Sequence, residues 1–332
     1  MPLEHGPRIL GVIASVFLTV GAGALLRRVN WLTAEADESL LKLVIRLLIP
    51  CLILRAVVGA ESLRSFGNLA VPPMVGFVLC AGGVLVGLAV ARLGAGLTGL
   101  STPVERRTFA FCVGLFNYGF VPIPLVKGLF SDNNATLGVL FVHNVGVELA
   151  IWTVGLLVLT GALGRGWWRR LLNPPSIAIV VAVTLNLLLS RLELQPEALG
   201  PVWLAVELLS HAAIPVSLLL VGATIADELR PTSNGHTLGQ SARIIGWGVA
   251  LRLAALPALF VLLATLLPVT TELKRVMVIE AGQASAVFPV VMARHYGGSP
   301  GVAVRIVLAT SLLSLLTMPL WIAGGLGWLG LF

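Results

Sequence analysis

The stretch from Ile279 to Pro289 places polar side chains inside an otherwise apolar segment. Glu280, Gln283 and Ser285 offer carboxylate, amide and hydroxyl oxygens, which are the ligands that a hard cation such as sodium prefers. An unpaired charge at bilayer depth is costly, so such a residue is a candidate for function. Glu280 therefore either helps to bind a coupling ion or pairs with a cation, for which Arg252 in the preceding segment is the obvious candidate.

A second polar interruption lies in residues 111–125, where Asn117, Gly119, Pro122 and Pro124 divide an apolar stretch. Because proline removes a backbone donor and blocks the preceding helical turn, we expect the helix to unwind here. Unpaired peptide groups at bilayer depth are tolerated only where they are buried in protein or line a cavity. Such breaks often form the binding site of secondary transporters. We therefore assign residues 117–124 to a transport site, in which Asn117 bonds the substrate or the opposing break.

Polar residues also occur in the apolar segment that follows, at His143, Asn144 and Glu148. Asn144 and Glu148 are four residues apart and share a helix face, and His143 lies beside that face. A buried histidine or carboxylate can carry a proton at physiological pH. The pattern predicts that Asn144 and Glu148 line the site, whereas His143 is either a proton carrier or a packing residue. Arg252 is an alternative partner for Glu148 as well as for Glu280.

The composition requires that these residues be held by membrane-spanning helices. Hydrophobic residues make up 57% of the chain and charged residues only 11%, against about 25% charged in soluble domains. The net charge of +7 comes from basic residues clustered in short connectors, a pattern of membrane topology rather than of nucleic-acid binding. Cys51, Cys80 and Cys112 lie in apolar segments without metal-type spacing, so we expect them to be packing residues. We see neither the nucleophile–base pair nor the metal cluster of an enzyme.

A membrane span needs about 20 largely apolar residues, and ten segments meet that criterion. We expect an all-α protein in which the fourth and ninth spans are broken. The predicted spans are approximately residues 8–27, 39–59, 68–92, 107–129, 135–160, 174–192, 203–226, 241–267, 271–296 and 300–325.

An internal repeat relates the two halves of the chain at an offset of 165 residues. The offset places Pro50 on Pro215 and Pro124 on Pro289. Because five spans is an odd number, the two repeats, 1–165 and 166–332, must face opposite sides of the membrane. Inverted repeats with broken helices in corresponding positions are typical of transporters. The more basic connectors should be cytoplasmic, which predicts a cytoplasmic-membrane protein with both termini outside.

Three stretches resemble the auxin efflux carrier family and its bacterial members. They are Asn117-Tyr-Gly-Phe-Val-Pro-Ile-Pro-Leu-Val126, Ile214-Pro-Val-Ser-Leu-Leu-Leu-Val-Gly-Ala223 and Leu312-Leu-Ser-Leu-Leu-Thr-Met-Pro-Leu320. The first resembles the family's Asn-x-Gly-Phe-x-Gly-x-Pro-Leu signature, with Pro122 where glycine is usual. The ninth span departs from the family pattern and is similar instead to the Glu-x-Gly-x-Gln-x-Ser segment of bile acid:sodium symporters. By that likeness Glu280 and Gln283 would bind sodium.

The resemblance implies an elevator-type transporter. Spans 3–5 and 8–10 would form a moving transport domain with crossed broken helices, and spans 1, 2, 6 and 7 a scaffold through which a homodimer forms. The expected activity is secondary transport of a small carboxylate, with sodium as the candidate coupling ion and no other cofactor. The alternatives are a sodium-dependent bile-acid-like symporter and a proton-coupled or uncoupled auxin-like carrier. The expected substrate-binding residues are Asn117, Gly119, Pro122, Pro124, Asn144, Ser285 and Pro289, and the ion-coupling residues are Glu280, Gln283, Glu148 and His143.

Overall fold

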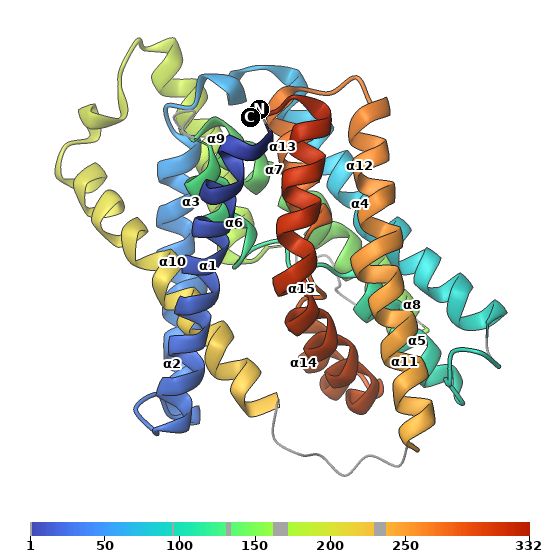
Figure 1. Cartoon of the computed structure of the whole chain (residues 1–332). Helices are drawn as coiled ribbons and strands as arrows, with labels where there is room; N and C mark the ends of the chain where they lie inside the picture. The colour runs from blue at the N-terminus through green and yellow to red at the C-terminus, as the bar shows by residue number, and fades with distance from the viewer. Residues whose placement is uncertain (1, 95, 131–133, 162–171, 229–236) are drawn as a thin grey trace.

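The computed structural model describes residues 2–94, 96–130, 134–161, 172–228 and 237–332. Within these ranges the chain is helical, and the only β-type pairing is an isolated bridge between two unwound segments. The first residue of helix α1 (Pro2–Arg28) and the last of α15 (Pro300–Leu329) lie at the same end of the bundle (Figure 1). The predicted all-α fold class is therefore correct for the described residues.

Seven helices in the described ranges are long and apolar enough to cross a membrane. They are α1, α4 (Phe66–Leu93), α7 with α8 (Ala135–Ala150 and Leu156–Thr160), α9 (Pro174–Arg191), α10 (Pro201–Glu228), α11 with α12 (Leu238–Ala250 and Leu256–Leu266) and α15. The pairs α7–α8 and α11–α12 are joined by single π-helical turns, Ile151–Gly155 and Leu251–Ala255. Short 3₁₀ turns, Glu61–Arg64 and Pro196–Leu199, precede α4 and α10.

Three of the ten predicted spans have a different form. Residues 34–57 make one continuous helix, α2 (Ala34–Leu43), a π-helical turn (Val44–Leu48) and α3 (Ile49–Val57), which carries Lys42, Arg46 and Arg55. The fourth predicted span divides into α5 (Pro103–Gly114) and α6 (Pro122–Leu129), and the ninth into α13 (Thr271–Ala281) and α14 (Phe288–His295). The helix of residues 34–57 is not among the seven because it carries too many charged side chains. The fourth and ninth predicted spans are not among them because each is divided into two short helices. The count of ten spans stays a prediction.

The helices pack in two groups that lie side by side (Figure 1). In one, α10 packs along both α1 and α3, and α3 also packs against α9. In the other, α4 packs against α5 and α7, while α15 packs on α11 and α13. Both groups use glycine where helices meet: a Cβ on Gly222 would lie 1.9 Å from the Val20 carbonyl oxygen, and one on Gly146 would lie 1.7 Å from that of Pro73. Small residues at these contacts let the backbones approach closely.

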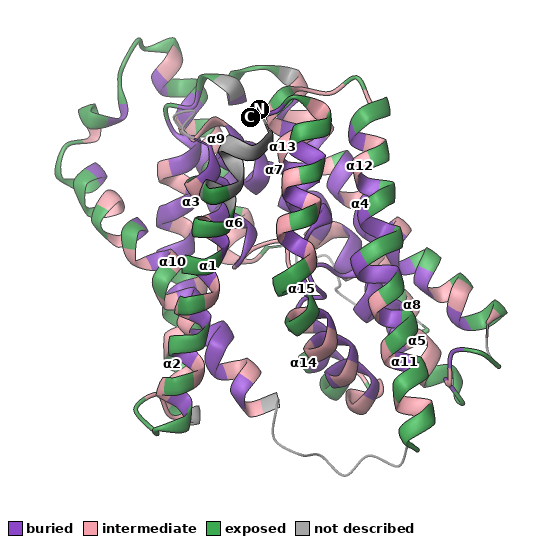
Figure 2. Ribbon diagram, in the orientation of Figure 1, coloured by how far each residue is buried: buried purple, intermediate pink, exposed green. Residues whose placement is uncertain are grey.

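Large apolar side chains are exposed on the outer faces of the bundle. Leu18, Val180, Leu208 and Leu316 are among them, and exposed positions follow the outer sides of α1, α10 and α15 (Figure 2). The middle of the bundle is buried and includes most of α5 and α13. An apolar exterior of this extent fits a lipid environment, because soluble monomers rarely expose such continuous patches.

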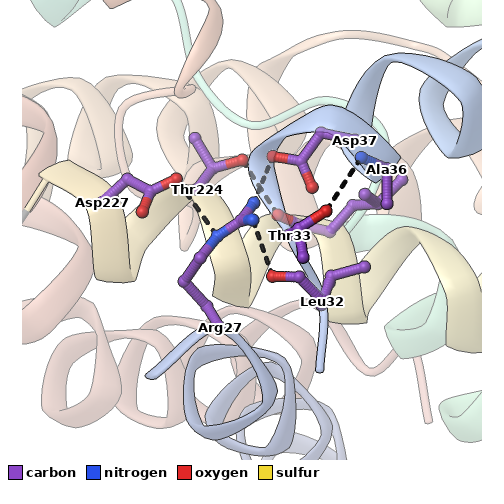
Figure 3. Close-up of polar contacts among 8 residues, drawn as sticks. Arg27, Leu32, Thr33, Ala36, Asp37, Thr224 and Asp227 are labelled. Carbon is purple, nitrogen blue, oxygen red and sulfur yellow. Dashed lines mark hydrogen bonds and ion pairs between the residues drawn. The ribbon is translucent and has the colours of Figure 1, made fainter. Parts of the chain in front are cut away.

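Arg27 ties three helices of the first group together (Figure 3). Its guanidinium group pairs with Asp37 of α2 and, at 3.2 Å, with Asp227 of α10, and it donates to the Leu32 carbonyl at 2.7 Å. Thr33 accepts from the Ala36 N–H and so caps α2 beside this network. Arg27 is buried, so its pairing offsets the cost of removing its charge from water.

Candidate functional site

Prolines begin the second half of each broken helix. Pro122 and Pro124 lie in the first turn of α6, and Pro289 lies in the first turn of α14. Proline is tolerated there because these positions need no intrahelical donor. The N–H groups of Ile123 and Leu125 already bond the carbonyls of Gly119 and Val121. The first turn of α6 therefore has no free N–H for an anion, contrary to what a simple half-helix site would offer.

The two unwound segments run antiparallel and pair with each other. Phe116 and Ser285 form the isolated bridge. The Asn117 N–H donates to the Ala284 carbonyl and the Ala286 N–H donates to the Leu115 carbonyl, both at 2.9 Å. These bonds satisfy backbone groups that the breaks would leave unpaired. The Asn117 backbone therefore bonds the opposing break, and a bond from its side chain to the substrate or to that break stays a prediction.

A small cavity of about 30 Å³ lies at this crossing. Asn117, Gln283 and Ser285 line it from the breaks, and Ser311 and Ser314 line it from α15. Apolar side chains of α1 and α10, among them Phe17, Val20, Val221 and Ile225, form its other wall. The cavity therefore lies between the two helix groups and has room for about one water molecule.

Sequence reasoning missed two of the polar residues that line this cavity and singled out none of its apolar ones. Ser311 and Ser314 are three residues apart and thus share one face of α15, a spacing that could have identified them. Of the residues expected to bind substrate, Gly119, Pro122, Pro124 and Pro289 shape the breaks and are absent from the cavity wall. The structure thus brings Asn117, Gln283 and Ser285 together.

Helix α7 supports the first break from behind. The Asn144 amide donates to the Tyr118 carbonyl at 2.7 Å, and the Tyr118 hydroxyl donates to Glu148 at 2.6 Å. Trp152 donates to the other Glu148 oxygen at 2.9 Å, and the His143 ring nitrogen Nδ1 lies 3.3 Å from the Asn144 amide oxygen. Asn144 and Glu148 therefore bond Tyr118, His143 lies beside Asn144, and none of the three is among the residues that line the cavity. Tyr118 had no assigned role in the sequence analysis, because its partners lie on another helix.

Arg252 supports the second break. Its Nε donates to the Gln283 carbonyl at 3.0 Å, and its Nη2 lies 3.4 Å and 3.3 Å from the carbonyls of Glu280 and Ala281. These are the carbonyls at the C-terminal end of α13, where the helix dipole favours a cation. The guanidinium group also lies over the Phe116 ring of the first break, 5.4 Å from its centroid. Arg252 thus contacts both breaks.

The guanidinium group of Arg252 bonds backbone carbonyls and not a carboxylate, which the sequence had suggested as its partner. Among the described residues, no carboxylate of Glu280 or Glu148 lies within 4.0 Å of the Arg252 guanidinium nitrogens. Arg252 does lie close enough to Glu280 for electrostatic interaction. It bonds backbone oxygens because the end of α13 presents three carbonyls to it.

The position of Arg252 follows from a local irregularity. It lies in the π-helical turn that precedes Pro257. Pro257 has no N–H to donate to the Leu253 carbonyl four residues earlier, and the Trp321 indole of α15 donates to that carbonyl at 2.8 Å. Single π-turns of this kind are frequent at functional sites.

Several buried oxygens beside the second break have no hydrogen-bond partner in the described structure. They are both carboxylate oxygens of Glu280, the amide oxygen of Gln283 and the hydroxyl of Ser285. The Gln283 amide nitrogen donates to the Ile279 carbonyl at 2.9 Å, which leaves its oxygen unbonded. Buried oxygens without partners are costly unless they bind a proton or a cation. Carboxylate, amide and hydroxyl oxygens are the kinds of ligand that a hard cation such as sodium prefers, so Glu280, Gln283 and Ser285 are the residues that could hold one.

Comparison with known proteins agrees with this geometry. The chain matches a family described as membrane transport protein over residues 9–166 and 162–322. It is also 25% identical to an uncharacterized transporter from Methanothermobacter thermautotrophicus over 314 residues, which are 93% of this chain and 96% of that protein. The matched ranges include both breaks and all the helices that line the cavity. The chain therefore belongs to the membrane transport protein family, the auxin efflux carriers that its sequence resembles, and is a multi-pass membrane transporter rather than an enzyme.

Proposed function

We propose that this protein is a secondary active transporter of a small organic anion, a carboxylate, by an elevator-type alternating-access mechanism. One observation carries the proposal: two unwound segments cross inside an apolar bundle and leave a cavity with polar side chains on one side and a second group of helices on the other. Irregular backbone at membrane depth is tolerated only where it is buried in protein or lines a cavity, and this crossing lines one. The Asn117 amide and the hydroxyls of Ser285 and Ser311 would donate hydrogen bonds to the substrate carboxylate, next to Ser314, whose hydroxyl donates to the Ser311 carbonyl at 2.7 Å.

The proposed architecture has ten spans in two inverted repeats, 1–165 and 166–332. The scaffold would comprise α1, α2–α3, α9 and α10, and the transport domain the remaining long helices with the crossed breaks. The packing of these helices in two groups, with the cavity at their contact, supports this division. The shared end of the termini supports an even number of spans, and we place both termini outside the cytoplasmic membrane. A homodimer would form through the scaffold.

The size of the cavity supports a small substrate and a moving domain. About 30 Å³ cannot hold an organic anion, so this structure represents a closed state of the proposed site. Sliding of the transport group along α1 and α10 would open the cavity, since apolar side chains of these two helices form one wall. A sterol-like anion, the alternative, would require a far larger rearrangement than a short carboxylate.

The buried charges support coupling to a cation. Cys80 of α4 is buried within electrostatic range of Glu148, Arg252 and Glu280. Two carboxylates and one guanidinium group leave one negative charge uncompensated when all three are ionised. Burial inside a membrane makes such an excess charge expensive. We propose that sodium bound by Glu280 and Gln283 balances it, and a proton on one carboxylate is the alternative.

Uptake by purified protein in proteoliposomes tests both parts. Screening short mono- and dicarboxylates under separate sodium and proton gradients should identify a substrate whose accumulation follows sodium. Asn117→Ala should abolish that uptake without loss of folded protein, whereas Thr184→Ala, on the exposed side of α9, should transport normally. Unchanged uptake by Asn117→Ala would refute the site. Uptake that ignores sodium and follows the proton gradient would replace the cation assignment of Glu280 and Gln283 with a proton.

A further inference from the structure

A second and larger cavity of about 400 Å³ lies away from the crossing, between the loop that joins α4 to α5 and the first turns of α11. Ser101 and Arg106 line it from the loop and α5, and Gln240 and Arg243 line it from α11. Its volume falls within the range of pockets that hold small ligands. The proposed transport mechanism uses none of these residues.

The loop and α11 form this cavity by close contact. Gly99 has a positive φ of 77°, and a Cβ there would lie 2.9 Å from the Gln240 carbonyl oxygen. Both adjoining helices begin with a capping box, Thr102 with Glu105 in α5 and Thr237 with Gln240 in α11. Glu105 accepts from the N–H groups of Ser101 and Thr102, at 2.7 Å and 3.1 Å. Hydrogen bonds and close packing therefore fix the residues that form this wall of the cavity.

Two guanidinium groups in this wall make it a site for an anion. The Nε of Arg106 is buried and has no hydrogen-bond partner. Arg243 makes a long contact of 3.5 Å from Nη1 to the Gly96 carbonyl. A planar guanidinium group matches the oxygens of a phosphate and binds them through paired hydrogen bonds. Two such groups beside a serine are suited to a phosphate.

Exposed apolar side chains lie close in sequence to the residues that line the cavity, and this setting favours a lipid over a free ion. Leu93, Leu97 and Leu238 are 90%, 65% and 92% exposed, and they lie at the end of α4, in the loop and at the start of α11. Side chains of this kind at a membrane surface contact acyl chains, while neighbouring arginines bind head groups. We propose that this cavity binds the phosphate of an anionic phospholipid, with Arg106 and Arg243 on the phosphate and the three leucines beside the acyl chains.

Lipid binding to the full-length protein tests the assignment. Native mass spectrometry after titration with phosphatidylglycerol in detergent measures how many lipids stay bound, and phosphatidylcholine serves as the zwitterionic comparison. Wild-type protein should retain phosphatidylglycerol in preference. Each arginine should contribute about fivefold to the affinity for phosphatidylglycerol. The double variant, Arg106→Gln with Arg243→Gln, should therefore bind this lipid about 25-fold more weakly than wild type. Arg92→Gln, an exposed arginine at the end of α4 outside this cavity, should retain wild-type binding.

Three outcomes would overturn the proposal. Equal losses in Arg92→Gln and the double variant would indicate a general surface charge effect. If the wild-type protein retained phosphatidylcholine as well as phosphatidylglycerol, the site would not recognise an anionic head group. Thermal stabilisation by inorganic phosphate equal to that by phosphatidylglycerol would show a free-anion site instead of a lipid site. If the double variant does not fold, Arg243→Gln alone should still show the fivefold loss, and binding to wild type should weaken as salt rises.

Discussion

The two breaks share a topology but are held in place by different chemistry. At the first, neutral or acidic side chains of α7 bond to Tyr118, through the Asn144 amide and the Glu148 carboxylate. At the second, the Arg252 guanidinium group bonds carbonyls at the end of α13, and Thr310 accepts from the Ser285 N–H at 3.3 Å. The first break is therefore held by bonds to the side chain and the carbonyl of Tyr118. The second is held by bonds from the Arg252 cation to its backbone carbonyls.

The predicted internal repeat, with its offset of 165 residues, sets Arg252 of the second half against a glycine of the first half. The offset places Gly87 of α4 at the position of Arg252. A Cβ on Gly87 would lie 3.0 Å from the Cα of Ala110, so α4 and α5 approach too closely there for a long side chain. The second half leaves space for Arg252, and its charge partly offsets that of the buried Glu280. If the predicted repeat is correct, close packing at Gly87 and a buried cation at Arg252 are alternative ways to support a broken helix.

Arg252→Met should have the largest effect, because it removes the only described cation that bonds the second break. Three carbonyls would lose a donor, and Glu280 would lose its nearest compensating charge. We expect the free energy of unfolding to fall by about 3 kcal/mol and uptake to be lost. Thermal unfolding in detergent and proteoliposome uptake would measure the two effects.

The matched control for this change is Arg191→Met, at the exposed end of α9. It removes the same charge without touching either break and should leave stability within about 0.5 kcal/mol of wild type. Adding Glu280→Gln to Arg252→Met should restore part of the stability, since the uncompensated carboxylate is then removed. Wild-type stability in Arg252→Met would show that packing alone supports both breaks.

A smaller effect is expected at the first break, from the bond between Tyr118 and Glu148. Hydrogen bonds to charged groups contribute about 1.5–3 kcal/mol, so Tyr118→Phe and Glu148→Gln should each destabilise by less than Arg252→Met. A double-mutant cycle should give a coupling energy of at least about 1 kcal/mol. Unfolding transitions of the two single variants and the double variant measure this coupling. Additive effects would mean that Asn144 alone holds the break.

The sequence predicted the breaks and three of the polar residues that line the cavity, but not what supports the breaks. Proline at Pro122, Pro124 and Pro289 restricts the backbone locally, so the interruptions could be located without a structure. Asn117 and Gln283 could be identified because polar side chains inside an apolar membrane segment are costly and so indicate function.

Contacts between different helices could not be predicted from the sequence pattern of each helix alone. Spacing along one helix placed Asn144 and Glu148 on a shared face, yet it could not show that this face meets Tyr118. The sequence suggests carboxylates as partners of Arg252, because it shows side chains and not the carbonyls that an interrupted helix exposes. Ser311 and Ser314 were overlooked because α15 carries no break and no charge beside them.

The smallest effect is expected from Gly119→Ala, which asks how far the substrate site extends into the first break. A Cβ there would meet no heavy atom within 4 Å, and Gly119 is not among the glycines with positive φ. Replacing glycine in such a position restricts the unfolded chain, so stability should be unchanged or rise by about 0.4–1 kcal/mol. Uptake should stay within about twofold of wild type, because Gly119 does not line the cavity. Loss of uptake by a fully folded Gly119→Ala protein would mean that the substrate enters the space beside Gly119 when the cavity opens. The first break would then contact the substrate along its unwound length, and the second would be left mainly with the ion.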